Sequence, residues 1–254
     1  MELAKEGFSI LLISRTQSKL DELEAEMAKT FPLVQFKTLA IDYSKFDDKA
    51  QEAVKAKLQE IDLAILVNNV GVAYEFPKYF DEMTSSEVND MIRINCDSTT
   101  IMSHLALPAM LKRKGGSRRG AIINIASAAG LNSMPLLSQY SAAKAYVRLL
   151  SEGMAAEYKP KGIDIQVQTP YYIVSKLSKL RHSSLSVPSS KAYAQDVVRN
   201  IGYETVSNPH PIHAIMGFFI SQVLPVSIGD QVIMSMHLPI RARGLKKAGV
   251  KKEQ

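Results

Sequence analysis

Short apolar runs alternate with charged segments of helical spacing along most of the sequence. Several of these runs have the length and β-branched content of buried strands. They are residues 8–13, 34–41, 63–67, 121–126 and 163–168. The first is continuously apolar, as expected for a strand that is buried on both faces. Charged helices are expected between them, for example over residues 18–29 and 47–60. We therefore predict an α/β fold, in which helices cover both faces of a doubly wound parallel sheet.

The strand expected at 121–126 is followed by small residues and then by a helix that carries Tyr140 and Lys144. Residues four apart lie on one helix face, so the phenol and the ammonium can converge. A nearby cation favours the phenolate, and we expect Lys144 to lower the pKa of Tyr140. Ser127 follows the strand and can hydrogen-bond a substrate carbonyl oxygen. These three residues suit hydride addition to a ketone, with Tyr140 as the proton donor.

A tyrosine four residues before a lysine occurs three times in the sequence. The copy that starts at Tyr74 encloses Pro77, which argues against a helix. The copy that starts at Tyr172 follows Pro170 and has no serine-bearing strand at a similar distance before it. Only the copy at Tyr140 combines strand, turn, serine and helix, so we place the catalytic tyrosine there.

Most of the formal net charge of +6 lies at the C-terminal end of the 254 residues. Residues 241–254 hold six basic residues and one acid, so this tail carries +5. Such a tail suits an anionic surface, for which a membrane leaflet is a good candidate. No nucleic-acid-binding motif accompanies it, and we exclude nucleic acid as a partner. The lone Cys96 excludes an internal disulfide and a cysteine-based zinc site, and we expect no metal.

The sequence resembles the short-chain dehydrogenases/reductases over residues 1 to about 252. The residues that carry this resemblance are Asn68-Asn69-Val70-Gly71, Asn95, Ser127 and Tyr140-Ser141-Ala142-Ala143-Lys144. Within the family it is most similar to the membrane-associated branch of very-long-chain 3-oxoacyl-CoA reductases and 17β-hydroxysteroid dehydrogenases of types 12 and 3. That closer likeness rests on residues 13–16 with Lys19-Leu20, on residues 170–177 and on residues 212–217.

The resemblance implies a Rossmann-like fold and an NADPH-dependent reductase of a bulky apolar ketone. The implied substrate is a 3-oxoacyl-CoA of fatty-acid elongation, reduced to the 3-hydroxyacyl-CoA, with 17-ketosteroids as further candidates. The resemblance also implies a membrane-associated protein and allows a homo-oligomer. Asn95 corresponds to the asparagine that orders a water for the proton relay. Tyr171 stands where the wider family has a glycine, and with Ser127 we expect it to contact the substrate.

An arginine just past the first strand indicates which nicotinamide cofactor is used. An acid there would bind the ribose 2′-hydroxyl of NAD, whereas Arg15 suits the 2′-phosphate of NADP, and we expect Lys19 to assist. The resemblance adds further cofactor-binding residues, beside Tyr140 and Lys144. They are Asp42 and Asn69 with Gly71 on the adenosine side, and Pro170, Ile173 and Ser175 at the nicotinamide carboxamide.

The family begins with a strand and a glycine-rich loop that wraps the pyrophosphate at a helix N-terminus. Residues 1–7 resemble the end of the helix that follows that loop. The glycines at Gly115, Gly116 and Gly120 precede a strand and cannot take the phosphate role. We therefore expect this sequence to lack the first strand and the loop, as an N-terminally incomplete form or one with impaired cofactor binding.

We divide the chain into a catalytic domain, residues 1–208, and an apolar and basic extension, residues 209–254. Residues 212–228 contain no charge, and their length and Pro225 favour a helix on a membrane surface over a buried helix or a span. The last four residues, Lys251-Lys252-Glu253-Gln254, resemble a dilysine retrieval signal and imply the cytosolic face of the endoplasmic reticulum.

Two other functions remain open at this point. One is a non-catalytic membrane-surface or lipid-binding protein that has lost the cofactor phosphate loop. The intact Ser127, Tyr140 and Lys144 speak against it, and the missing glycine loop speaks for it. The other is a soluble carbonyl reductase of small ketones.

Overall fold

The computed structural model describes residues 1–113, 120–223 and 225–249 of the chain. Its strands are β1 (Ile10–Ser14), β2 (Phe36–Ala40), β3 (Ile65–Asn68), β4 (Gly120–Ile125), β5 (Ile163–Gln168) and β6 (Val206–Ser207). Its helices are α1 (Glu2–Lys5), α2 (Gln17–Thr30), α3 (Asp48–Gln59), α4 (Ser85–Ile92), α5 (Ser98–Lys112), α6 (Ser138–Tyr158), α7 (Ser190–Arg199), α8 (Pro211–Phe218) and α9 (Val226–Lys247).

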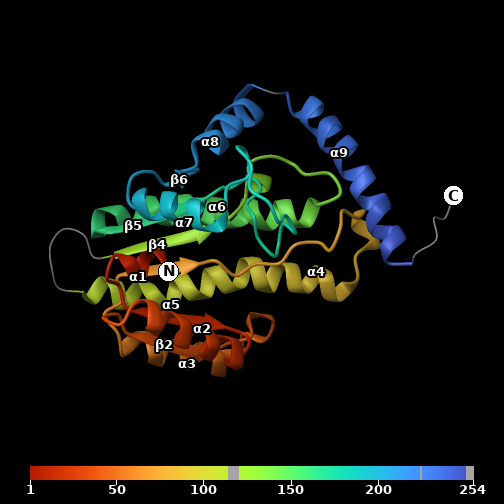
Figure 1. Ribbon diagram of the computed structural model, residues 1–254. Coiled ribbons are helices and arrows are strands. Elements are labelled where there is room, and N and C mark those ends of the chain that lie inside the picture. The colour runs from red at the N-terminus through yellow and green to blue at the C-terminus, as the bar shows by residue number, and fades with distance from the viewer. Residues whose placement is uncertain (114–119, 224, 250–254) are drawn as a thin grey trace.

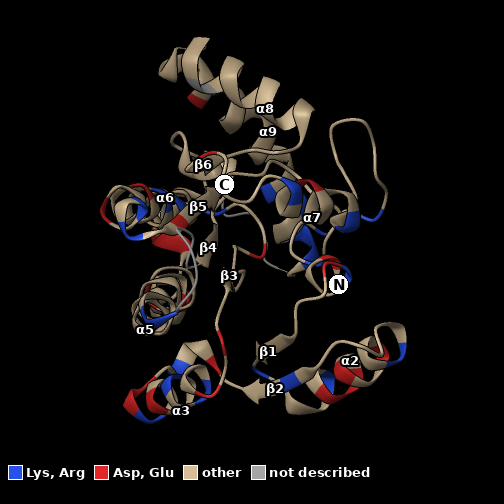
Figure 2. Cartoon of the chain, turned by 90° about the vertical axis from the view of Figure 1, so that its left-hand side faces the viewer, with Lys and Arg blue, Asp and Glu red and all other residues tan. Residues whose placement is uncertain are grey.

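Every strand pairing is parallel, and helices cover both faces of the strands. Figure 2 shows α3, α5 and α6 on one side of the strands, and α2 and α7 on the other. α5 packs against β3, α6 packs against β5, and α1 packs against α7. The predicted α/β fold with a doubly wound parallel sheet is confirmed.

The strands form two separate sheets. Within the described residues β1 pairs only with β2, while β3, β4, β5 and β6 form a second sheet in that order. In Figure 2 the strands follow one another as β6, β5, β4, β3 and then β1, β2. The expectation that residues 8–13 are buried on both faces is wrong, because all the apolar residues of β1 are only half-buried. Val67 of β3 is likewise 43% exposed. In the described part of the chain, no strand pairs with the second edge of either β1 or β3.

The best-buried part of the fold surrounds β4. Ile122 and Ile123 have no exposed surface, because β3 and β5 pair on either side and helices cover both faces. The buried Asn124 of β4 accepts a 2.8 Å hydrogen bond from Asn68 and donates one of 2.8 Å to Ser151 on α6. Satisfied buried polar groups of this kind fix strand and helix at one register. β4 and α6, which carry the expected catalytic residues, are therefore held rigidly together.

The sequence of residues 87–111, which starts polar and turns apolar, predicts one long helix, but the structure interrupts it. It begins with a capping box, in which Thr84 and Glu87 bond each other's backbone N–H groups. A π-helical turn, Arg93–Asp97, then separates α4 from α5. Turns of this type mostly occur at functional positions. The predicted relay residue Asn95 lies inside this turn.

The C-terminal residues form an arm that returns to the body of the protein (Figure 1). α8 leaves the sheet after β6, and a π-helical turn, Phe219–Val223, leads towards α9. α9 docks through Asp230, whose carboxylate accepts a 2.5 Å hydrogen bond from Ser133, and through Arg241, which pairs with Glu82. No helix among the described residues is long and apolar enough to cross a membrane. The residues of the dilysine pattern, 251–254, lie outside the described part of the chain.

Candidate active site

Ser127 lies just beyond the carboxyl end of β4, where the chain turns sharply. The extended backbone of Ser127 caps a short 3-10 turn, Ala128–Gly130, and its hydroxyl accepts a 3.2 Å hydrogen bond from the N–H of Ala129. The N–H of Ala128 donates to the carbonyl of Pro170, which ties this turn to the end of β5. Because Ser127 accepts from the backbone, its own O–H can donate, either to the neighbouring Tyr140 hydroxyl or to a substrate oxygen.

Tyr140 lies in the first turns of α6, and its hydroxyl meets that of Ser127. Burial is the largest effect on the pKa of Tyr140 and raises it above the ordinary value of 10.0. A hydrogen bond with Ser127 works in the opposite direction, and the nearby Tyr172 raises the pKa further. The two hydroxyls therefore lie close enough to bind one carbonyl oxygen together.

Lys144 is almost fully buried, with 5% of its surface exposed. Its Nζ donates a 3.0 Å hydrogen bond to the carbonyl oxygen of Ile125 and lies 5.8 Å from the centroid of the Tyr140 ring. Burial lowers the pKa of Lys144 from 10.5 to about 8. The expectation that Lys144 lowers the pKa of Tyr140 is wrong for this structure. The ammonium points to Ile125, and burial of the phenol dominates.

Asn95 and Gly71 complete the buried side of the site. The Asn95 amide donates 3.0 Å hydrogen bonds to the carbonyls of Val72 and Met91 and accepts one of 3.2 Å from the N–H of Val72. A methyl group on Gly71 would lie 3.0 Å from Asn95 Oδ1 and 3.3 Å from Lys144 Nζ. Gly71 therefore lets the chain pass between Asn95 and Lys144.

Arg15 and Asp42 follow β1 and β2 and lie close to each other. Arg15 is exposed, and its positive charge contributes to the lowered pKa of Asp42. The larger cause of that shift is the hydroxyl of Ser44, which donates to Oδ1 of Asp42 at 2.7 Å. Ser44 lies in the 3-10 turn Tyr43–Lys45, which packs against the π-helical turn that holds Asn95. The carboxyl ends of both sheets therefore face a common region, as ligand sites of such folds require.

These residues fit the adenosine end of a dinucleotide. Arg15 is an exposed cation at a strand end, and the hydrogen bonds recorded for Asp42 go to Oδ1, which leaves Oδ2 for a ligand. Lys19 on α2 and Asn69 on the segment after β3 are also exposed, and their contact with the cofactor stays a prediction. Gly115 and Gly116 lie outside the described residues, and a methyl group on Gly120 would lie 2.8 Å from the carbonyl of Ala64. Gly120 therefore serves close strand packing.

The three residues predicted to contact the nicotinamide lie in different surroundings along the segment after β5. Pro170 is buried beside the Ser127 turn, whereas Ser175 bonds Ser178 in a local turn. The carbonyl of Ile173 accepts from the hydroxyl of the same Ser178 at 2.6 Å. These three residues follow the strand end that adjoins Ser127. Their contact with the nicotinamide stays a prediction.

Tyr171 and Tyr172 take different directions. The ring of Tyr171 meets His213 of α8 edge to face at 5.6 Å, and α8 passes close to it at Gly217. Tyr171 thus packs against α8, and its contact with the substrate stays a prediction. The residue that lies near the Tyr140 hydroxyl is Tyr172, which is half-exposed. The sequence did not indicate this position, because the Tyr172 copy of the spacing follows Pro170 and has no serine-bearing strand at a similar distance before it.

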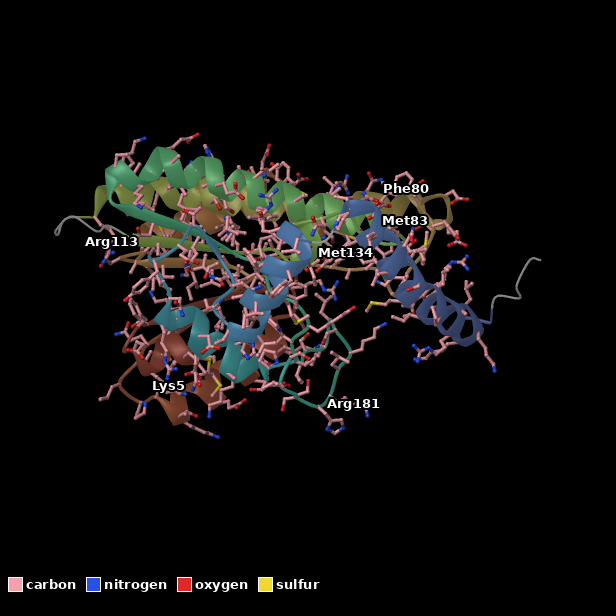
Figure 3. The ribbon with its side chains drawn as sticks, turned by 90° about the horizontal axis from the view of Figure 1, so that it is seen from above. Lys5, Phe80, Met83, Arg113, Met134 and Arg181 are labelled. Atoms are coloured by element: carbon pink, nitrogen blue, oxygen red, sulfur yellow. The ribbon has the colours of Figure 1, made fainter. Side chains whose placement is uncertain are left out.

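Three segments bond one another along one side of the site, and we call them the substrate wall. They are the segment around Tyr74 and Lys78, the segment around Leu136, and α9. The N–H of Lys78 bonds the carbonyl of Leu136, and the hydroxyl of Tyr74 accepts from the N–H of Gln139, next to the catalytic tyrosine. His237 of α9 bonds the carbonyl of Pro135 at 2.7 Å. Figure 3 shows Phe80 and Met83 beside α9, at the opposite end of the molecule from Arg113. α9, from the C-terminal arm, is therefore part of the wall of the site.

Comparison with known proteins agrees with this fold. A model of the short chain dehydrogenase family matches residues 1–185. The chain belongs to the short-chain dehydrogenase family, whose members are oxidoreductases that use nicotinamide cofactors.

Its relatives include very-long-chain 3-oxoacyl-CoA reductases. The chain is 41% identical to very-long-chain 3-oxoacyl-CoA reductase-B of Danio rerio over 97% of its own length and 78% of that protein. It is 38% identical to very-long-chain 3-oxoacyl-CoA reductase of Homo sapiens over 97% of its own length and 77% of that protein. The predicted similarity to this branch is confirmed.

Solved structures of low sequence identity share the fold. A 7β-hydroxysteroid dehydrogenase has a TM-score of 0.78 at 20% identity, covering 91% of this chain and 88% of that one. A short-chain dehydrogenase from Sphingobium yanoikuyae in complex with NADPH has a TM-score of 0.71 at 22% identity, covering 100% of this chain and 91% of that one.

Proposed function

We propose that this protein reduces the 3-keto group of a 3-oxoacyl-CoA to a hydroxyl in fatty-acid elongation, with NADPH as reductant. The observation that carries the proposal is the meeting of the Ser127 and Tyr140 hydroxyls above the buried Lys144. The names of the relatives support the substrate class. The exposed Arg15 beside Asp42 supports NADPH over NADH, because a guanidinium suits a 2′-phosphate.

The residues of this chain orient the ketone and move the proton. Ser127 donates to the carbonyl oxygen, while Tyr140 donates to the same oxygen and then releases its proton to it. A bound reduced nicotinamide supplies the hydride for the carbonyl carbon. Lys144 donates to the carbonyl of Ile125 and thereby holds the helix of Tyr140 against the strand that leads to Ser127. Asn95 bonds the backbone of Val72, next to Gly71. We propose that Asn95 also takes part in a proton relay.

We place the protein at a membrane surface, on the cytosolic face of the endoplasmic reticulum. The support lies in α8, α9 and the turn between them, which expose large apolar side chains. These are Ile215, Phe218, Phe219, Val223, Val226, Ile228, Val232 and Met236. Lys246 and Lys247 lie in the last turn of α9. An apolar face beside basic residues is the pattern of a helix that lies on an anionic bilayer.

The test starts with the full chain and NADPH. Binding is followed by the fluorescence of NADPH, and turnover by the loss of its absorbance with a long-chain 3-oxoacyl-CoA. Tyr140→Phe should lower kcat by about 100-fold or more, and Ser127→Ala by about 100-fold, while NADPH binding persists. Tyr203→Phe is the control, because Tyr203 is 80% exposed and outside the site. Turnover that survives Tyr140→Phe at the parent rate would refute the proposal.

The exposed apolar face of α8 and α9 also favours a second function, that of a non-catalytic protein that binds lipid or a membrane surface. In that case the chain binds vesicles but does not bind NADPH. Reduction of 17-ketosteroids and formation of a homo-oligomer are further predictions. The first is tested by the same absorbance assay with a 17-ketosteroid, and the second by light scattering of the purified chain.

A further inference from the structure

The loop between β5 and α7 carries several positive charges and no negative one. No Asp or Glu occurs between Asp164 and Asp196. The same stretch contains Lys176, Lys179 and Arg181 in the loop, and Lys191 on α7. A segment with this charge pattern attracts polyanions.

Backbone bonds hold both ends of this loop close to each other. The N–H of Val174 donates a 3.0 Å bond to the carbonyl of Pro188, and the hydroxyl of Ser190 donates a 2.8 Å bond to the carbonyl of Val174. The ring of His213 on α8 bonds the carbonyl of Ser186 at 3.0 Å. The loop therefore has a defined position next to α8.

That position is the mouth of the candidate active site. Tyr172, at the start of the loop, lies near the hydroxyl of Tyr140. Further along, Nζ of Lys179 donates a 2.8 Å bond to the carbonyl of Glu75, on the segment that leads into the substrate wall. The loop thus extends from the reacting groups to the rim of the site. Figure 3 shows Arg181 at the outer end of the loop.

The loop cations differ from the other cations of this rim. Lys78 pairs with Glu87, and Arg241 pairs with Glu82. Lys176, Lys179 and Arg181 are exposed, and none of them has a carboxylate partner within the described residues. Lys179 also has a left-handed backbone, with φ +58°, which is uncommon for a lysine and is typical of functional positions.

We propose that Lys176, Lys179 and Arg181 bind the phosphate groups of the coenzyme A that carries the acyl chain. This inference rests on the proposed function, since it assumes a thioester of coenzyme A as substrate. When the phosphates bind at the outer loop, the pantetheine arm can extend inward past Tyr172. The 3-keto group then reaches Ser127 and Tyr140. The cations would contribute to the binding of the substrate and not to the chemical step.

The experiment compares two substrates with the same reacting group. One is a 3-oxoacyl-CoA, and the other is the same acyl group on N-acetylcysteamine, which lacks the nucleotide and its phosphates. The variant combines Lys176→Ser, Lys179→Asn and Arg181→Ser. Asparagine is chosen because it tolerates the left-handed backbone. The control is Lys191→Ser, which removes an exposed cation from the same acid-free stretch near Glu2.

The triple variant should raise the KM for the CoA thioester about tenfold or more, since charge-assisted hydrogen bonds are lost. Its KM for the N-acetylcysteamine thioester and for NADPH should equal that of the parent. Added salt should raise the KM of the parent for the CoA thioester only. An equal rise for both thioesters, or no rise for either, overturns the inference.

Calorimetry with coenzyme A alone separates this inference from the proposed function. The parent should bind coenzyme A more tightly than the triple variant, whether or not any thioester is reduced. Failure of both thioesters as substrates would refute the proposed function, while retention of coenzyme A binding by the variant would refute the phosphate site. Binding to vesicles of phosphatidylserine should be the same for parent and variant. A loss confined to vesicle binding would assign the loop to lipid headgroups and overturn the inference.

Discussion

Lys144 is bonded to the strand that leads to Ser127. Its Nζ donates a 3.0 Å hydrogen bond to the carbonyl oxygen of Ile125, the last residue of β4 and two residues before the serine. The same lysine belongs to the helix that carries Tyr140. One buried ammonium therefore sets the relative position of the strand end and the helix that carries Tyr140.

Burial of Lys144 makes stability depend on pH. Its pKa falls from 10.5 in the exposed state to about 8 in the folded chain. Below pH 8 both states hold the proton, and the folded state carries the full cost of the buried charge. Between these two pKa values the unfolded chain binds more protons, so the free energy of unfolding rises with pH. The total rise is about 3 kcal/mol.

Lys144→Met should abolish this rise, because methionine does not titrate. Urea unfolding of parent and variant, below pH 8 and above pH 10.5, measures the difference. Lys49→Met, at an exposed lysine of α3, should keep the behaviour of the parent. A parallel pH dependence in the parent and in Lys144→Met would show that the ammonium is not buried in solution.

Gly71→Ala should damage the site and the fold together. The added methyl group would lie 3.0 Å from Asn95 Oδ1 and 3.3 Å from Lys144 Nζ, both of which are held by hydrogen bonds. We expect a loss of about 1–3 kcal/mol in stability and a fall in kcat. Gly153→Ala is the matched control. Gly153 lies within α6 with no atom near its added methyl group, so this change should stabilise the protein by about 0.5–1 kcal/mol.

The strand and the helix of the candidate site could be predicted because their signals are local. The strand at 121–126 and the helix that carries Tyr140 and Lys144 each show their own period, and both fall close to the observed β4 and α6.

The remaining features depend on contacts between residues far apart in sequence. β6 has only two residues, too few for a period, and it forms because β5 offers an edge. Burial of residues 8–13 was overestimated because periodicity does not show whether both edges of a strand are paired. The place of α9 in the wall depends on contacts such as Arg241 with Glu82, which lie 159 residues apart. No pattern in either segment indicates the other.

Arg15→Asp should reverse the cofactor preference of the protein. A carboxylate repels the 2′-phosphate of NADPH and can accept hydrogen bonds from the ribose hydroxyls of NADH. The ratio of kcat/KM for NADPH to that for NADH should fall about 100-fold, measured by absorbance with one 3-oxoacyl-CoA. Lys29→Asp, at an exposed lysine near the end of α2, is the control and should leave the ratio unchanged. An equal loss with both cofactors would contradict a role of Arg15 in binding the 2′-phosphate.

Gly244→Val should loosen α9 from the substrate wall. A Cβ at Gly244 would lie 2.6 Å from the Cβ of Phe76, a distance that the packed ring cannot accept. The strain should weaken the neighbouring pair of Arg241 with Glu82, and α9 should become more accessible to protease than in the parent. KM for a long-chain 3-oxoacyl-CoA should rise, because α9 is part of the wall. Adding Phe76→Gly removes both the ring and the Cβ that the valine would meet, so the double variant should regain part of the protease resistance that Gly244→Val alone has lost. Equal protease sensitivity in the parent and in Gly244→Val would show that α9 does not rest on Phe76 in solution.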